Sequence, residues 1–546
     1  MRAFSVVHRD ADVADATADV VDVLVVGMGA TGAGIALDAA SRGMSVVVVD
    51  KGDVASGTSS KSSKLVHGGL RYLENLELGL VHESVVERQI LQRLAPHLVR
   101  PMDFVYPVLS DTAKANLIGI GLTTYDVFAG VRNVRRHRRL SAEEAIALVP
   151  PLAGSDLTRA YVYGDCATDD ARLVLAVVRA ARGFGAIALT YAEVVDLHEA
   201  DGRASGATLR DILTGGEVEI RARHVVNAAG VWVDEVRALE DPARPASLQP
   251  SKGVHLVVDH VSLPLTTASV FLPSRQGDER SMFAIPWGRQ TILGTTDTTY
   301  DGPLDTPSVE QADVDYCLAA ANAVFGLHLQ QGDVVGGWAG LRPLLRASGA
   351  ASPSDMSRRH AVSEGPSGLI TVTGGKLTTF RRMAKDVVDR IVARDSRHAR
   401  CRTAEIPLGS SRPLDRQVTD LGSLGAELAE LLVRQYGAAA PDVAGLAAGA
   451  DLFAPLSPAA AHIEAEVVYA ARHEGAATLA DVLSRRTRLS LRAADAAMPS
   501  ARRAADLLAQ EVGRDVEWAA AQVEQYAAGV RAERGALGLA FQRSLT

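Results

Sequence analysis

The hydrophobic pattern near the start of the chain predicts a strand, a helix and a second strand in succession. Val21–Val26 is a short apolar run rich in β-branched residues, which is typical of a buried strand. Ala30–Arg42 has helical spacing with small residues at its start, and Val46–Val49 has the pattern of a second buried strand. These three segments predict a βαβ unit that opens an α/β fold.

Further along, the pattern predicts two amphipathic helices and then a set of strands. Apolar residues at three- and four-residue spacing predict helices over Glu77–Leu98 and Asp169–Phe184, with Asp169 as the N-cap of the second. Strands follow between Gly-rich turns, and the last two indicate a second, antiparallel sheet: Ala186–Leu197, Ala204–Leu213, Glu217–Val226, Val254–Val258 and Thr291–Leu293.

Beyond about Arg400 the strand pattern ends and alanine-rich helical segments take over. Residues 407–413 have the composition of a linker, so we expect a separate helical domain over 401–546. Its predicted helices are Leu424–Tyr436, Ile463–His473, Thr478–Leu491, Arg502–Val512 and Val516–Arg531.

Composition excludes several classes of protein. The chain has 546 residues, 47% of them hydrophobic, which is enough for about two to four domains. The net charge of −8 argues against a nucleic-acid partner. Cys166, Cys317 and Cys401 are widely separated, so we expect no disulfide framework and no metal site, and a cytoplasmic location is favoured. We find no apolar run long enough for a spanning helix, and Met1–Val20 reads as a variable leader without the apolar core of a signal peptide.

A glycine pattern between the first predicted strand and helix fits a dinucleotide. Gly27 permits a tight turn, Gly29 lets the backbone approach a diphosphate, and Gly32 lets helix and strand pack closely. The helix N-terminus would stabilise the diphosphate through its N–H groups and dipole. Asp50, at the end of the second strand, can accept ribose hydroxyls. A Gly-rich turn without a ligand is the alternative, and the motif by itself does not separate FAD from NAD.

Two later stretches suit a flat ring system. Residues 224–230 are a strand that runs into small residues, which would give the ring access to the backbone. Residues 372–380 are a strand, a glycine pair and a helix start, and that helix N-terminus can face the electron-rich end of a flavin. Either stretch, taken alone, is also compatible with an ordinary loop.

Longer motifs carry a family resemblance. Residues 58–74, TSSKSSKLVHGGLRYLE, resemble the signature of FAD-dependent glycerol-3-phosphate dehydrogenases of the respiratory, membrane-associated kind. The resemblance covers about residues 21–530. Further motifs keep the order of that family: YGDCATDDARL (163–173), SKGVHLV (251–257), IPW (285–287), GTTD (294–297), GLRPL (340–344) and GGKLTTFR (374–381).

The resemblance implies a fold and a set of partners. The fold is of the α/β class, α+β overall: a glutathione-reductase-like FAD-binding domain, a substrate-binding domain with an antiparallel sheet, and an all-α C-terminal domain. We assign about 21–100, 155–235 and 335–400 to the FAD-binding domain and about 101–154 and 236–334 to the substrate-binding domain. The resemblance implies bound FAD, glycerol 3-phosphate as substrate, a quinone as electron acceptor, and peripheral contact with the inner face of the cell membrane; a homodimer is compatible with it.

The resemblance also assigns roles by motif position. Arg358 is followed by Arg359, and which of the two faces the site is left open. The substrate-site positions are Arg71, Tyr72, His255, Arg342, Arg358 and Lys376. The residues expected to bind FAD are Gly27, Gly29, Thr31, Gly32, Asp50, Thr58, Ser59, Ser62, Ser63, Lys64, His67, Ala228, Gly230, Gly375, Leu377 and Thr378.

These residue types suit the oxidation of a secondary alcohol that carries a phosphate. A base must take the hydroxyl proton, and His255 is the best candidate because its ordinary pKa lies near working pH. His67 is a second candidate, although we favour a flavin contact for it. The arginines and Lys376 can neutralise the phosphate, and Arg342 or Lys376 could instead stabilise the alkoxide at C2. A hydrogen-bonded core histidine and salt-bridged arginines are the plain alternatives.

An arginine-rich run, Val131–Leu140, follows the apolar residues Asn116–Leu122. Anionic lipid attracts such clusters by about 1 kcal/mol per Lys or Arg, so the run is a candidate membrane contact, with a solvated loop as the alternative.

Three other functions compete with the quinone-linked dehydrogenase. A glycerol-3-phosphate oxidase would pass the electrons to oxygen. A flavin amine or amino-acid oxidase would clamp a carboxylate, often with one arginine, and would not need this many cations. A non-catalytic flavin-binding module attached to membranes would show no bleaching of the flavin by substrate.

Overall fold

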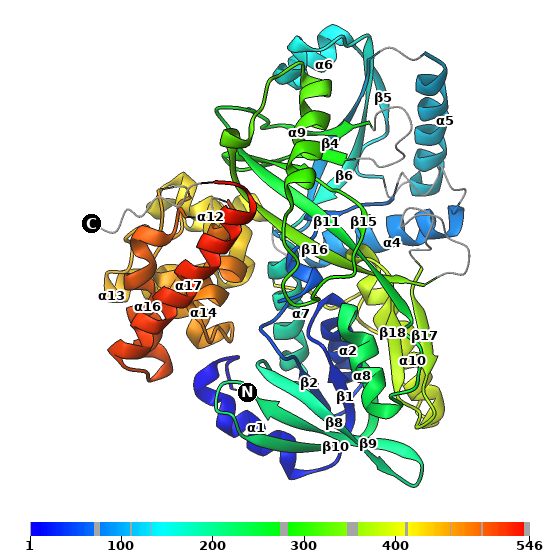
Figure 1. Cartoon of the computed structure of the whole chain (residues 1–546), viewed down its shortest axis with the longest axis vertical. Helices are drawn as coiled ribbons and strands as arrows, with labels where there is room; N and C mark the ends of the chain where they lie inside the picture. The colour runs from blue at the N-terminus through cyan, green and yellow to red at the C-terminus, as the bar shows by residue number, and fades with distance from the viewer. Residues whose placement is uncertain are drawn as a thin grey trace.

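The computed structural model describes residues 2–69, 77–109, 112–130, 133–273, 282–346, 359–409, 413–458, 460–492 and 495–539. They form two β-sheets, one above the other in Figure 1, with a group of helices beside them.

The first sheet grows from the predicted βαβ unit. Strand β1 (Val21–Val26) pairs in parallel with β2 (Val46–Val49) and with β10 (Glu217–Asn227), and α2 (Ala30–Ser41) connects β1 to β2. Parallel neighbours need such a crossover because the chain must return to the same end of the sheet. The strand order is β17-β18-β10-β1-β2-β7, with β9 attached to β10 and β8 to β9. The remaining strands are β7 (Ile187–Leu189), β8 (Ala192–Ala200), β9 (Arg203–Asp211), β17 (Ala361–Glu364) and β18 (Ile370–Thr373).

Three helices cover one face of this sheet. Helix α2 packs between α7 (Asp170–Gly183) and α10 (Phe380–Arg394), and their apolar stripes share one buried core with β1 and β2. Gly34 of α2 faces α10, and a Cβ there would lie 2.8 Å from the Phe380 ring, so the missing side chain allows the two helices to approach closely. Asp169 caps α7 as predicted, since its side chain accepts a hydrogen bond from Arg172 N at 3.0 Å. The opposite face carries α1 (Arg9–Ala18), α8 (Val233–Glu240) and the β8–β9 hairpin.

The second sheet was predicted to be antiparallel, and its strand pairs are antiparallel except for β12 with β4, which pair in parallel. Successive side chains of a strand point to opposite faces. One face therefore carries aliphatic residues that pack on α9 (Gln311–Phe325), and the other carries aromatic residues. Its order is β15-β11-β14-β13-β12-β4-β6-β3, with β16 on β11 and β5 on β6. The strands are β3 (Leu65–Val66), β4 (Arg100–Val108), β5 (Arg138–Ser141), β6 (Arg159–Ala167), β11 (Leu248–Asp259), β12 (Ala268–Leu272), β13 (Met282–Trp287), β14 (Gln290–Gly294), β15 (Thr298–Thr299) and β16 (Val334–Leu345).

Besides α9, the helices α4 (Leu78–Leu94), α5 (Thr112–Ala129) and α6 (Ala142–Leu148) lie beside this sheet.

The C-terminal part is a helical unit with its own buried core. It lies to one side of both sheets in Figure 1. Its helices are α11 (Leu414–Asp420), α12 (Ala426–Tyr436), α13 (Ala440–Ala450), α14 (Ala465–His473), α15 (Leu489–Arg492), α16 (Met498–Val512) and α17 (Val516–Ala536), with a π-helical segment at Asp481–Arg486.

The structure differs from the sequence-based expectation in several places. The expected strand Ala186–Leu197 is two strands, β7 and β8, because Tyr191 between them has a left-handed backbone (φ 55°). The expected helix Thr478–Leu491 is the π-helical segment followed by the short α15. Residues 1–20, expected as a leader, contain α1, whose Arg9 hydrogen-bonds Asp211 at 3.1 Å.

The boundaries between the two sheets also differ from those we expected. Strands β3, β6 and β16 belong to the second sheet, although their residues fall in ranges assigned to the FAD-binding domain. The chain therefore crosses between the sheets within these ranges, and long strands carry residues from one sheet to the border of the other.

Candidate active site

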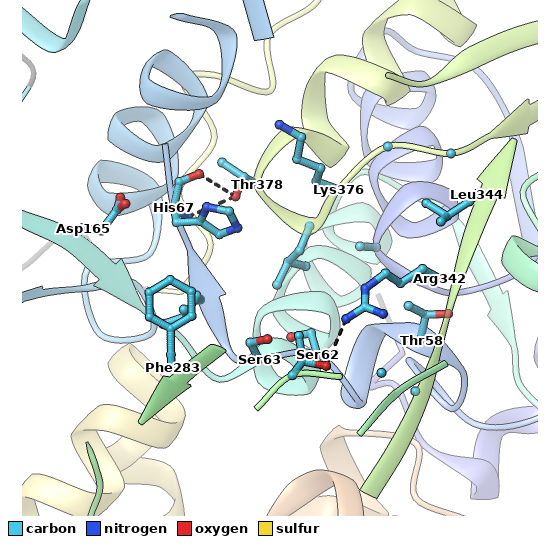
Figure 2. A pocket seen from close by; sticks show the side chains of 18 of the residues that line it. Thr58, Ser62, Ser63, His67, Asp165, Phe283, Arg342, Leu344, Lys376 and Thr378 are labelled. Carbon is cyan, nitrogen blue, oxygen red and sulfur yellow. Dashed lines mark hydrogen bonds between the residues drawn. The ribbon is translucent and has the colours of Figure 1, made fainter. Parts of the chain in front are cut away.

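A cavity of about 820 Å³ lies between the two sheets. The first sheet contributes the turn after β1, the end of β10 and the loop after β18. The second contributes the aromatic face of β4, β12 and β13 and one face of β11 and β16. Figure 2 shows the side chains that converge on it.

The glycine motif sits where the predicted dinucleotide turn requires it. Gly27 has φ 105°, and a Cβ on it would press against the carbonyl of Ala228, the residue after β10. A Cβ on Gly32 would overlap the Gly27 carbonyl oxygen, so helix α2 can begin this close to the strand only with glycine there. Gly29 and Thr31 border the cavity at the N-terminus of α2.

Asp50 lies behind this turn and does not line the cavity. Its carboxylate accepts hydrogen bonds from Met28 N at 2.6 Å and from Gly52 N at 2.9 Å. Burial raises the pKa of Asp50, and the two backbone N–H groups oppose that shift. Asp50 therefore fixes the shape of the turn, and its expected bond to a ribose stays a prediction.

Most residues expected to bind FAD border the cavity. Besides Gly29 and Thr31 these are Thr58, Ser59, Ser62, Ser63, His67, Ala228, Gly230, Gly375, Leu377 and Thr378. Thr378 Oγ1 lies 3.2 Å from His67 N and 3.3 Å from His67 O (Figure 2), which ties the loop after β18 to the segment after β3.

Lys64, like Asp50, does not border the cavity, because its side chain turns away from it. Its Nζ lies 3.1 Å from Asp170 Oδ1, and only 2% of the residue is exposed. Burial and nearby Arg488 lower the pKa of Lys64 to about 8, against the opposing pull of Asp170. The structure therefore does not support the expected flavin contact for this lysine.

His255 lies on the cavity face of β11. Antiparallel register places it opposite Trp338 of β16, and the two rings stack with centroids 5.0 Å apart. Its Nε2 is 2.8 Å from Ser63 Oγ, while its Nδ1 is enclosed by protein without a hydrogen-bond partner. Burial, and then Arg342 and Lys64, lower the pKa of His255 well below its ordinary range, so the ring is neutral at pH 7.

Arg342 lies on the same face of β16, opposite Ser251 in the register of the two strands. Its guanidinium is 3.3 Å from Asp297 Oδ1 and donates to Thr295 Oγ1 at 3.0 Å. A Cβ on Gly253 would overlap the guanidinium, so this glycine makes the space in which Arg342 lies.

Lys376 immediately precedes the short 3-10 helix Leu377–Thr379, on another side of the cavity. Its Nζ donates to Ser84 Oγ of α4 at 3.0 Å, and Figure 2 shows the ammonium turned away from Arg342. The structure thus brings His255, Ser63 and Arg342 together but leaves Lys376 apart from them. Arg71, Tyr72 and Arg358 lie outside the described residues, whereas Arg359 is described and exposed.

Two parts of the cavity could not be predicted from the sequence: a buried polar cluster and most of the apolar wall. Asp165 borders the cavity and is paired with Arg88 at 2.6 Å, with Tyr125 Oη 3.2 Å away. Pairing across such distances leaves no local signature, although the alternation of aromatic residues on β4 marked the wall. The wall consists of Phe104, Tyr106, Leu117, Ile118, Ile120, Phe271 and Phe283.

In the described part of the chain, no group of three or more His, Cys, Asp or Glu side chains could hold a metal ion. The same residues include no helix long and apolar enough to cross a membrane.

The arrangement fits FAD. A glycine turn at a helix N-terminus can take the diphosphate, and the small residues Ala228, Gly230 and Gly375 leave room for a flat ring within reach of His255. The model of the FAD dependent oxidoreductase family matches residues 22–388, and that of the C-terminal domain of alpha-glycerophosphate oxidase matches residues 401–520. Fold and site together define an FAD-dependent oxidoreductase.

Relatives narrow this class. A glycerol-3-phosphate dehydrogenase of Mycobacterium leprae is 40% identical, over 94% of this chain and 88% of that protein. The aerobic glycerol-3-phosphate dehydrogenase of Bacillus subtilis is 37% identical, over 89% and 90% of the two chains. The crystal structure of the glycerol-3-phosphate dehydrogenase from Bacillus halodurans, complexed with FAD, superposes with a TM-score of 0.81 at 30% identity, over 99% of each chain. The chain therefore belongs to the FAD-dependent glycerol-3-phosphate dehydrogenase family, and its cofactor is FAD, as the resemblance predicted.

Proposed function

We propose that this enzyme oxidises sn-glycerol 3-phosphate to dihydroxyacetone phosphate and passes the electrons to a membrane quinone. The observation that carries the proposal is the group formed by His255, Ser63 and Arg342, which offers a neutral base and a cation on one wall of the FAD cavity. When bound, the flavin accepts the hydride from C2 of the substrate.

His255 has the position and the protonation state of the base. A base must be unprotonated before the reaction, and the lowered pKa of His255 keeps it so at neutral pH. Because Nδ1 is enclosed, Nε2 is the ring nitrogen placed to take the hydroxyl proton, with Ser63 Oγ as its hydrogen-bond partner.

Arg342 suits the reacting end of the substrate. It lies near enough to His255 to lower the pKa of that histidine, so the same charge would stabilise an alkoxide forming at C2. Lys376 lies elsewhere along the cavity and suits the phosphate, which carries close to two negative charges. Arg71 and Arg358 keep their expected role at the phosphate end, and Tyr72 its expected place in the substrate site, as predictions.

The proposal that a quinone accepts the electrons is supported by the apolar wall of the cavity and by helix α5. Leu117 and Ile120 border the cavity and are also 69% and 64% exposed, and Val127 of the same helix is 74% exposed. Arg136 and Arg139, just beyond α5, are exposed as well. We therefore place α5 against the inner face of the cell membrane, where an apolar quinone ring could enter the cavity beside Phe104 and Phe283.

The test begins with an anaerobic spectrum of the purified yellow protein. Glycerol 3-phosphate should bleach the oxidised flavin bands, whereas glycine or proline should not. Absence of bleaching by glycerol 3-phosphate would contradict the proposed substrate and favour a flavin-binding module or an amine oxidase. The reduced enzyme is then mixed with a soluble quinone or with oxygen. Faster reoxidation by quinone supports the dehydrogenase, and stoichiometric peroxide would instead identify a glycerol-3-phosphate oxidase.

A further inference from the structure

A buried charged cluster lies behind the turn that holds Ser62 and Ser63. At its centre is Asp170, the first residue of α7, whose side chain is fully buried. Its carboxylate accepts hydrogen bonds from Ser62 N at 3.0 Å and Ser62 Oγ at 2.7 Å, and it pairs with Lys64 and with Arg488. Burial alone would raise the pKa of Asp170, but Lys64 and Arg488 hold it below its ordinary range.

Arg488 also holds the backbone of the same turn. Its guanidinium donates to the Ser60 carbonyl at 3.0 Å, and Lys64 Nζ lies 3.2 Å from the same oxygen. Five residues of the turn, 60–64, are therefore fixed from behind at both ends, while their other side faces the flavin cavity. Ser63, within the turn, lies with its Oγ 2.8 Å from His255 Nε2.

A second path runs from the cluster to the same histidine. Lys64 Nζ lies over the Trp338 ring, 4.5 Å from its centroid, and Trp338 stacks on His255. A change at Arg488 would therefore reach His255 from two sides, through Ser63 and through Trp338.

Arg488 belongs to the helical C-terminal unit, and its local backbone is unusual. It follows the π-helical segment Asp481–Arg486, and its own φ is 64°, a left-handed conformation that a non-glycine residue adopts at a cost. Its side chain is completely buried, which is unfavourable for an arginine unless it is paired. Strain and burial concentrated on one arginine at the edge of an active site indicate a role beyond joining two parts of the chain.

We propose that Arg488 is a positioning residue through which the C-terminal unit sets the active-site base. It orients Asp170 and the 60–64 turn, and these in turn hold Ser63 against His255. This inference rests on the proposed function, because the rate it affects is the reduction of the flavin by glycerol 3-phosphate.

The experiment compares Arg488→Met with wild type in anaerobic stopped flow. We expect the limiting rate of flavin reduction to fall about 10- to 100-fold, because a small displacement of a reacting group costs that much. The apparent affinity for glycerol 3-phosphate should change less than about threefold, since Arg488 is not in the substrate site. Arg488→Lys keeps the charge but loses the planar fork, so its rate should lie between the two.

A second readout does not depend on turnover. The ring resonances of His255, followed by NMR in oxidised holoenzyme with labelled histidine, should shift in Arg488→Met. The matched control is Arg172→Met, which removes another buried pair between α7 and the C-terminal unit, Arg172 with Glu474 at 2.7 Å, without touching the 60–64 turn. It should lower the melting temperature while leaving the rate and the His255 resonances unchanged.

Each outcome decides the proposal. A folded Arg488→Met enzyme with the wild-type rate and unshifted His255 resonances overturns it, as does an equal loss of rate in Arg172→Met. If Arg488→Met does not fold, Arg488→Lys, which keeps a cation beside Asp170, provides the test and must itself show a slower rate and shifted His255 resonances. A wild-type flavin that glycerol 3-phosphate does not reduce contradicts the proposed function instead, and the His255 resonances then test Arg488 alone.

Discussion

The Asp297 carboxylate lies 3.3 Å from the Arg342 guanidinium and so prevents the arginine from acting as an isolated positive charge. Thr295 accepts a second hydrogen bond from the same side chain. The orientation of the guanidinium is thereby fixed before substrate arrives, at the expense of part of its net attraction for an anion.

Removing this guanidinium should slow the oxidation of glycerol 3-phosphate. A charge-assisted hydrogen bond contributes roughly 1.5–3 kcal/mol, so Arg342→Met should lower kcat/KM for glycerol 3-phosphate by about 10- to 150-fold. If Arg342 stabilises the C2 alkoxide, kcat should carry most of the loss. The measurement is steady-state kinetics with a soluble quinone, with flavin content and melting temperature as controls. Equal loss on plain glycerol together with a lower melting temperature would mean that Arg342 is structural.

Lys376 should behave differently from Arg342. Its ammonium donates to Ser84 on α4, so binding a phosphate would require it to exchange that partner or share it. Lys376→Met should therefore raise KM for glycerol 3-phosphate by about tenfold or more, with a smaller change in kcat. Inhibition by glycerol 2-phosphate should weaken in parallel. Near wild-type kinetics in both Lys376→Met and Arg342→Met would exclude both residues from the substrate site.

The glycine turn offers a direct test of FAD binding. Gly29→Val places a branched side chain beside Ser59 at the edge of the cavity, where the diphosphate is expected, so the protein should purify largely without flavin. Gly183→Ala is the control, because a Cβ at the end of α7 meets nothing within 4 Å. The ratio of absorbance at 450 and 280 nm reports occupancy, on the order of one flavin per chain in wild type. Full occupancy in Gly29→Val would contradict the assignment.

Acid should destabilise the enzyme through His97. Burial, and then nearby Arg172, lower the pKa of His97 to about 4, below the value near 6.5 of an unfolded chain. The unfolded state therefore binds the proton more tightly, and the stability tied to the neutral ring is complete above about pH 6.5 and falls as pH drops toward 4. The change amounts to about 3 kcal/mol over that window.

The measurement uses a variant that cannot titrate at this position. His97→Gln should be less stable at pH 7 because His97 packs closely against Gly409 and Gly437, but its free energy of unfolding should fall less with acid than that of wild type. Parallel curves of urea midpoint against pH for the two proteins would show that His97 does not contribute.

Membrane contact should depend on α5 and on the arginines that remain available beside it. Arg135 pairs with Asp103 and Arg138 with Glu144, so Arg136 and Arg139 are the better candidates of the basic run. Replacing both with Ser should weaken binding to anionic vesicles roughly 10- to 30-fold, and added salt should have a similar effect. Leu117→Ser with Ile120→Ser should weaken binding to neutral vesicles as well. Unchanged co-sedimentation of both double variants would leave the solvated loop as the better interpretation.

The sequence was most informative where a function depends on neighbours along the chain. The glycine turn, the Asp169 cap and the parallel β1–β2 pair each follow from local chemistry, and the structure contains all three. It was least informative where a role depends on a distant partner. Lys64 lies within the family signature, yet its ammonium faces Asp170 because α7 passes behind the turn, and no local pattern records that packing.

The same limit explains two other differences. The stretch 478–491 has helical spacing, but part of it forms a wider π-helical turn. In this conformation Arg486 is buried against Asp53, and Arg488 against Asp170. The pairing of Arg342 with Asp297 became visible only once β11 and β16 were in register, because β11 carries Ser251 beside both side chains.

The segment that holds Phe4 and Ser5 is joined to residues far along the chain. Ser5 Oγ donates to the Ala471 carbonyl across 466 positions of sequence, and Gly475 N donates to the Phe4 carbonyl. During synthesis Phe4 and Ser5 must therefore wait for more than 460 further residues to leave the ribosome before they can find these partners. Closing so long a loop is entropically costly and slow, so the joint between the FAD-binding part and the helical unit should be among the last contacts to form. In a nascent chain stalled before residue 470, the surface that these contacts cover would stay exposed to chaperones and proteases.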